Sequence, residues 1–214
     1  MFIELAEHLC CPEDHEETFC VIAAEEIVER SVVRGTVGCP ICHAEYPIRD
    51  GVVALFPPGT PVPDQPAGTF AMEAAVVQAL LDLSGPGGYV ALIGSAGHVA
   101  ADLAGLCAGV EMIVVDPPKG VVAGSHVSVI LGAGRIPLRR ATARGIVFGP
   151  EVRSAAQLED VRRVLLPGLR AVTVGAGAPL PGLDTLATDG ERWVGTRRQD
   201  SGGGSGSGSS GGSR

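Results

Sequence analysis

Residues 89–116 read YVALIGSAGHVAADLAGLCAGVEMIVVD, and this stretch sets the architecture expected of the chain. The apolar run at residues 89–93 ends in a glycine turn at 94–97, a helical stretch follows, and the apolar run at 112–115 ends on Asp116. Apolar strands without polar alternation are typical of a parallel sheet covered on both faces. The stretch therefore predicts the first strand, helix and strand of a doubly wound α/β sheet.

The same alternation continues in the second half of the chain. Residues 145–148 predict another strand, and Ser154 can cap a helix that the Pro-Gly pair at 167–168 stops. A strand at 171–174 and a final antiparallel strand around 192–195 complete the predicted sheet.

Two stretches of biased composition divide the chain. Proline-rich residues 57–68 read as a linker, and the Gly/Ser-rich tail at 199–214 is too polar to order itself. The predicted units are thus a small module at 1–56 and a larger domain at 69–198. The chain has no apolar run of membrane-spanning length and its N-terminus lacks a basic start, so we expect a cytoplasmic protein without a membrane span.

The N-terminal module carries a split cysteine pattern. Cys11 precedes a proline, and Cys39 and Cys42 form a Cys-Pro-Ile-Cys turn. Two such turns brought together by a hairpin can hold one zinc ion, as in a zinc ribbon. The fourth ligand is open between His15 and Asp14, because both imidazole and carboxylate bind zinc, and His15 is favoured.

The sequence supports other roles of these cysteines less well than zinc binding. The run CPICH at residues 39–43 also fits c-type haem attachment, but that chemistry and disulfide formation both need export, for which the N-terminus carries no signal. Cys10 and Cys20 lie outside the metal spacing and are interpreted as small buried apolar residues.

Charge is uneven along the chain, whose net charge is −8. Residues 1–134 hold 17 acidic and 4 basic side chains, whereas residues 135–214 hold 7 acidic side chains and 12 arginines. A local basic stretch could face RNA or an acidic partner, or consist of solvated arginines that offset the acidic half. Its members are Arg135, Arg139, Arg140, Arg144 and Arg153.

The segment at residues 46–56 holds more apolar side chains than so small a module can cover by itself. We therefore expect it to dock on a partner surface, either the second domain of this chain or another subunit.

Both units resemble known families. Residues 5–56 resemble the zinc-ribbon family related to the activator subunit of tRNA and protein methyltransferases, through Cys11-Pro12, CPIC at 39–42 and YPIRDGV at 46–52. Residues 69–197 resemble a minimal class I S-adenosylmethionine-dependent methyltransferase, most clearly in LEDVRRVLLPG at 158–168. The resemblance implies a Rossmann-like sheet with a small N-terminal zinc ribbon.

The second resemblance implies an S-adenosylmethionine site at the carboxyl ends of the strands. Gly94, Ser95 and Gly97 would approach the cofactor, and Asp116 would accept hydrogen bonds from its ribose. The chain departs from that family elsewhere, with Leu92 where an acid normally stands on the first strand and further losses at Ala133 and residues 144–145.

These departures favour a binding or scaffold subunit with a degenerate cofactor site. The alternatives are an active methyltransferase acting on RNA or protein, and a nicotinamide-dependent oxidoreductase that would use the same turn. His98 and His126 are interpreted as structural histidines.

Overall fold

The computed structural model describes residues 1–57, 59–60, 68–175 and 180–199. Most of the predicted linker and tail therefore lies outside the described residues. The elements follow in the order η1 (Ile3–His8), β1 (Val21–Val28), β2 (Ser31–Gly38), β3 (Glu45–Arg49), β4 (Val52–Ala54), α1 (Ala74–Leu81), β5 (Tyr89–Ile93), η2 (Gly94–Val99), α2 (Ala100–Leu106), β6 (Glu111–Val115), β7 (Val127–Leu131), β8 (Ala143–Phe148), α3 (Ala155–Val164), β9 (Leu165–Val174), β10 (Leu183–Thr188) and β11 (Arg192–Arg197).

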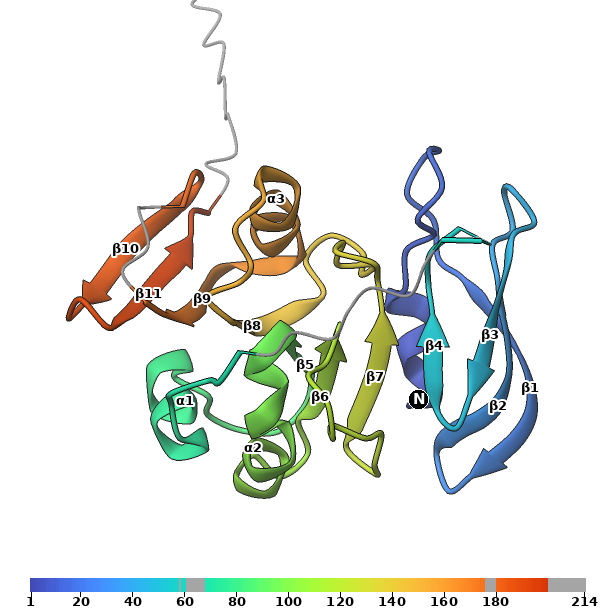
Figure 1. The fold of residues 1–214 in the computed structure, drawn as a ribbon, viewed down its shortest axis with the longest axis horizontal. Coiled ribbons are helices and arrows are strands. Elements are labelled where there is room, and N and C mark those ends of the chain that lie inside the picture. The colour runs from blue at the N-terminus through green and yellow to red at the C-terminus, as the bar shows by residue number, and fades with distance from the viewer. Residues whose placement is uncertain (58, 61–67, 176–179, 200–214) are drawn as a thin grey trace, which may run out of the picture.

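Eleven strands form one sheet in the order β1-β2-β3-β4-β7-β6-β5-β8-β9-β11-β10 (Figure 1). The pairs from β7 through β9 are parallel, and the β9, β11 and β10 pairs are antiparallel. Numbered along the chain from β5, the parallel strands lie in the order 3-2-1-4-5, as in a doubly wound fold. This order confirms the predicted α/β class and puts the topological switch point between β5 and β8.

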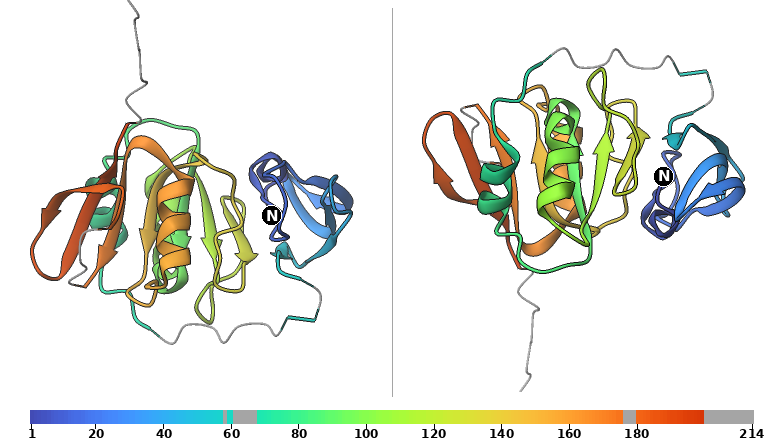
Figure 2. Two further views of the ribbon diagram at one scale, coloured as in Figure 1. Left: turned by 90° about the horizontal axis from the view of Figure 1, so that it is seen from above. Right: turned by 90° about the horizontal axis from the view of Figure 1, so that it is seen from below.

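Helices cover both faces of this sheet (Figure 2). Along β5, Val90 and Leu92 join the apolar cluster under α1 and α2, whereas Ala91 and Ile93 join the cluster under α3. A strand buried on both faces needs no polar alternation, which explains its continuous apolar run. Among the described residues the longest α-helix is α3, with 10 residues. No helix among the described residues has the length and apolar character needed to cross a membrane.

The N-terminal module extends the sheet of the second half. β4 pairs in parallel with β7, in register from Val52 with Val129 to Ala54 with Leu131. Leu55 continues the pairing, since its N–H donates to the carbonyl of Leu131 at 2.8 Å. The partner surface of the apolar segment at 46–56 is therefore the chain's own second domain.

The module and the α3 face of the sheet share one apolar core. Tyr46, Ile48 and Leu55 are at most 1% exposed and belong to the same cluster as Val161 and Val164 of α3. The prediction that these groups need a partner is confirmed. Their burial makes the two halves one packed unit.

The end of helix α3 differs from the prediction. Ser154 caps the helix, its hydroxyl accepting from the N–H of Gln157 at 3.2 Å, as expected. The helix nevertheless ends at Val164, and β9 begins at Leu165 and runs through Pro167. The register of β9 against β8 shifts in this region, which accommodates a proline that cannot donate to the ladder.

Candidate metal centre and candidate cofactor cleft

Four possible metal ligands converge at the tip of the N-terminal module. Cys11 follows η1, His15 lies in the next loop, and Cys39 and Cys42 flank the turn between β2 and β3. One ligand atom from each lies within 4.8 Å of all the others. Asp14 is not a member of this group, so between the two open alternatives the structure brings His15 to the cysteines.

The spacing of the ligand atoms fits a tetrahedral site. The sulfur atoms of Cys11 and Cys42 are 3.6 Å apart, and Nε2 of His15 is 3.3 Å from Sγ of Cys39. Zinc bond lengths of about 2.0–2.3 Å place tetrahedral ligands about 3.3–3.8 Å from one another. Nδ1 of His15 lies 2.7 Å from the carbonyl of Glu16 and can donate to it, which leaves Nε2 facing the sulfurs.

The thiols differ in acidity. Burial raises the pKa of Cys11 to about 11, although the Tyr46 hydroxyl, 3.2 Å from its sulfur, acts in the opposite direction. Burial also opposes ionisation of Cys39, but the backbone N–H groups of Cys42 and Ile41 lower its pKa to about 7. The turn thus stabilises the thiolate form that binds metals.

Cys10 and Cys20 stay outside the four-residue group, as the spacing predicts. Burial raises the pKa of Cys20 to about 12, so this thiol is neutral at ordinary pH.

The predicted cofactor turn is tightly wound. Residues 94–99 form the 3₁₀ helix η2, in which Gly94, Ser95, Ala96 and Gly97 are all buried. A Cβ on Gly97 would lie 2.6 Å from a methyl carbon of Val114, so this glycine lets the turn pack closely against β6. Gly97 therefore serves packing in this structure.

A carboxylate of the chain itself occupies the opening of this turn. Oε1 of Glu151 accepts from the N–H of Ser95 at 2.5 Å, and Oε2 accepts from the Ser95 hydroxyl at 3.0 Å. A Cβ on Gly94 or Gly149 would lie 2.1–2.4 Å from these carboxylate oxygens. Two glycines and Ser95 thus form a recess that holds one carboxylate.

Glu151 is not among the site residues that the sequence predicted. It follows β8, and Ser95 follows β5, two adjacent parallel strands whose carboxyl ends meet at one edge. An acid three residues after the end of a strand at the switch point was the available signal.

Asp116 directly follows β6, as predicted, and its carboxylate faces the loop after β7. Oδ1 accepts from the N–H of Gly132 at 2.7 Å, and Oδ2 accepts from the N–H of Gly134 at 2.8 Å. Burial raises the pKa of Asp116, against the effect of these N–H groups. Both oxygens therefore have partners within the chain.

Leu92 lies away from the opening of the turn. Its side chain is fully buried in the core shared with α1 and α2. The position that would carry an acid in the resembled family is thus an apolar core position in this fold.

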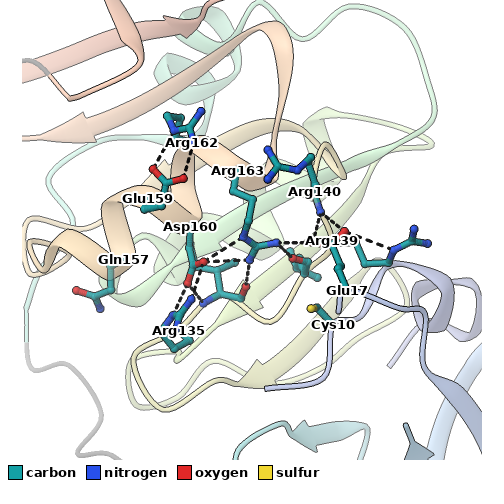
Figure 3. A network of polar contacts seen from close by, with 12 residues as sticks. Cys10, Glu17, Arg135, Arg139, Arg140, Gln157, Glu159, Asp160, Arg162 and Arg163 are labelled. Atoms are coloured by element: carbon teal, nitrogen blue, oxygen red, sulfur yellow. Dashed lines mark hydrogen bonds and ion pairs between the residues drawn. The ribbon is translucent and has the colours of Figure 1, made fainter. Parts of the chain in front are cut away.

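The basic stretch is largely engaged within the chain (Figure 3). Arg135 pairs with buried Asp160, with 2.7 Å between Nε and Oδ2, and Arg163 of α3 pairs with the same carboxylate at 3.0 Å. Glu17 lies 3.3 Å from Arg163 and accepts from the N–H of Arg140 at 3.1 Å. These contacts tie the loop after His15 to the second half.

Two other arginines of the stretch bind backbone carbonyls. Arg144 donates to the carbonyls of residues 84–87, and Arg153 donates to that of Pro150. The arginines therefore stabilise local structure in this fold.

No protein-family model and no curated protein matches the chain. Solved methyltransferase structures are similar to it at low identity. A proposed S-adenosyl-L-methionine-dependent methyltransferase of Methanococcus maripaludis is 13% identical, with a TM-score of 0.47, over 59% of this chain and 84% of that one. A complex between the Haloferax volcanii Trm112 methyltransferase activator and a methyltransferase gives 15% identity and a TM-score of 0.40, over 47% of this chain and 50% of that one.

Geranyl diphosphate methyltransferase bound to GPP and sinefungin gives 18% identity and a TM-score of 0.40, over 47% of this chain. The chain spans 43% of the length of that protein. The fold class is α/β with a doubly wound sheet, and the strand order described above is the observation that assigns it.

Proposed function

We propose that this protein is a methyltransferase-like binding or scaffold subunit whose cofactor site is degenerate. The observation that carries the proposal is the contact between Glu151 and Ser95. In this proposal the carboxylate of S-adenosylmethionine would compete with Glu151 for the N–H and hydroxyl of Ser95, and an intramolecular carboxylate competes at high effective concentration. Like charges also repel, so a bound carboxylate and Glu151 are mutually exclusive there.

The first strand supports the same proposal. It presents an apolar core residue, Leu92, where the resembled family has an acid, so no charged side chain from β5 is available for the cofactor. A lost charge-assisted hydrogen bond is worth about 1.5–3 kcal/mol, or one to two decades of affinity.

We further propose that Cys11, His15, Cys39 and Cys42 hold one zinc ion. Four protein ligands close the coordination shell and leave no position for water or substrate, so such an ion stabilises structure. The Tyr46 hydroxyl beside Cys11 and the Glu16 carbonyl beside His15 supply the outer hydrogen bonds that orient metal ligands.

Protein partners would bind the composite surface made by the fused ribbon and sheet. In this proposal the ribbon acts on its own chain through β4 and β7, so it needs no separate methyltransferase subunit. A basic RNA-binding face is disfavoured because four of the five arginines of the stretch have side-chain partners within the chain, namely Arg135, Arg139, Arg144 and Arg153.

An active methyltransferase acting on RNA or protein is the second candidate, and one observation favours it. The Glu151 side chain is exposed, so it can leave the recess without unfolding the chain. Each Asp116 oxygen also has a second lone pair for a ribose hydroxyl.

Calorimetric titration of zinc-loaded protein with S-adenosylmethionine separates the two candidates. The scaffold proposal expects no binding at concentrations up to about 1 mM. A micromolar dissociation constant that is lost in Asp116→Ala would support the enzyme and overturn the scaffold.

A further inference from the structure

Strand β1 of the N-terminal module forms one outer edge of the sheet (Figure 1). Among the described residues it pairs with β2 alone, and the pairing is regular from Val21 to Ala24, before a bulge between Ala24 and Glu26. The N–H and carbonyl groups on the other side of β1 have no strand partner there. An edge of this kind can accept an added strand.

Exposed apolar side chains gather along this edge. The described residues hold nine large apolar side chains that are exposed, and four of these are Phe19, Val21, Ile27 and Val28, each about half exposed. A fifth, Ile41, lies in the turn that follows β2, and the other four lie singly in other parts of the fold. Single exposed apolar groups are ordinary, whereas a group of them marks an interaction surface.

The pairing of β1 with β2 shows why Val21 is uncovered. Ile22 packs against the apolar core, so Val21, its neighbour along the strand, points to the opposite face. Opposite Val21 stands Gly38, which has no side chain to cover it. Cys20 is buried and Phe19 is exposed, so the free apolar surface continues beyond the start of the strand.

The charge of the module determines which partner fits. Residues 1–34 hold 9 acidic and 2 basic side chains. Glu25 and Glu26, in the second half of β1, share one cation, Arg34, at 3.0 and 3.4 Å. A second copy paired antiparallel along β1 would bring these glutamates close to their own counterparts, and like charges across a strand pair are destabilising. A strand that carries lysine or arginine would be attracted instead.

We propose that the edge of β1 binds an extended segment of a partner protein in which basic and apolar side chains alternate. The segment adds a strand beside residues 21–24, its apolar side chains contact Phe19 and Val21, and its basic side chains lie near Glu25 and Glu26. Such binding rests on the scaffold role proposed above and gives that role one surface and one class of partner.

The test is a nuclear magnetic resonance titration of full-length, zinc-loaded protein with a capped peptide of alternating lysine and valine, as long as β1 itself. Saturable shifts of the amides of residues 19–24 are expected, with a dissociation constant of about 100 μM or below. A peptide of alternating glutamate and valine should bind at least about tenfold more weakly. The lysine–valine peptide methylated on two adjacent central backbone nitrogens should be weakened as much, because neither of its edges can complete the ladder.

Two variants of the protein locate the site. Val21→Lys places a cation against the cationic peptide on an exposed position and should weaken binding about tenfold or more. Leu186→Lys is the matched control, because Leu186 is also about half exposed but lies on β10, the opposite edge of the sheet, and it should leave the affinity unchanged.

Three results would overturn the proposal. The first is no saturable shift at about 1 mM peptide, and the second is equal binding of the glutamate–valine peptide, which decides on the native protein even if Val21→Lys misfolds. The third is dimerisation in sedimentation that Val21→Lys abolishes, since a second copy would then occupy the edge. S-adenosylmethionine is titrated into the same sample, where its binding would overturn the scaffold role and missing peptide binding would overturn the β1 site alone.

Discussion

The Glu151 carboxylate and the backbone N–H of Ser95 meet 2.5 Å apart at the point where the sheet reverses its winding direction. Open α/β sheets bind ligands at that point, beyond the carboxyl ends of the strands. In this protein the first group found there is a side chain of the chain itself.

Removing that side chain should open the recess. We expect Glu151→Ala to strengthen S-adenosylmethionine binding about tenfold or more over the native protein, because it frees two donors and removes a like charge. Glu191→Ala, an exposed substitution in the turn before β11, is the control. Equal affinity in all three proteins, measured by calorimetry, would show that Glu151 does not compete with the cofactor.

An acid at position 92 on β5 should destabilise the fold, although the family resemblance suggests that it would improve cofactor binding. Leu92→Asp would place a carboxylate in a fully buried apolar core, so it should destabilise the fold by several kcal/mol. Leu92→Met conserves volume and should cost less than about 1.5 kcal/mol. Urea denaturation measures both, and a stable Leu92→Asp protein with improved cofactor binding would contradict the structural placement.

Zinc removal should affect more than the N-terminal module. The sequence alone suggests that only about the first fifty residues unfold, but Cys11 and Cys39 lie in the same core as α3. Because structural zinc supplies about 10–16 kcal/mol in small zinc-finger peptides, a chelator should lower one shared melting transition.

Elemental analysis should find one zinc per chain in the native protein and in Cys20→Ser, and none in Cys39→Ser. Two separate calorimetric transitions, with the second unaffected by the chelator, would argue against a shared core.

The contribution of the β4–β7 pairing to stability can be tested by truncating one leucine. Leu55 is fully buried at that joint, so Leu55→Ala should reduce the free energy of unfolding by about 2–5 kcal/mol. Leu186→Ala removes the same atoms from a side chain that is 52% exposed and should change stability by no more than about 0.5 kcal/mol. Similar costs for both variants in urea denaturation would be incompatible with the joint.

The Asp160 carboxylate predicts a pH dependence of stability. Burial opposes its ionisation, but Arg135, the N–H of Ile136 and Arg163 together hold its pKa below the ordinary 3.8. A lowered folded-state pKa contributes stability that is present above the unfolded value and is lost as the pH falls through the folded value.

Asp160→Asn should therefore cost on the order of 3 kcal/mol at neutral pH. The difference between the two proteins should begin to shrink as the pH falls through the ordinary value of 3.8, and it should vanish only below the lowered folded-state pKa. Exposed Asp184→Asn should show little effect across the same range. A difference between native and Asp160→Asn that stays constant down to the lowest pH would exclude this role of the charge.

Local sequence determined the elements and the metal-ligand spacing. The continuous apolar runs of β5 and β6 match strands buried on two faces, and the Cys-Pro-Ile-Cys turn brings Cys39 and Cys42 together because both lie within one short turn. The cap at Ser154 is equally local. Such features depend on a few neighbouring residues, so periodicity and spacing are sufficient to predict them.

Tertiary structure decided the contacts between distant residues. Only the packed chain brings His15, and not Asp14, to the three cysteines, pairs Val52 with Val129 and places Glu151 against Ser95, 56 residues away. It also makes Leu92 a core residue. Each of these outcomes depends on which strands become neighbours. The arrangement of the strands is set by the total apolar surface that the whole sheet buries, and the pattern of one segment cannot predict that total.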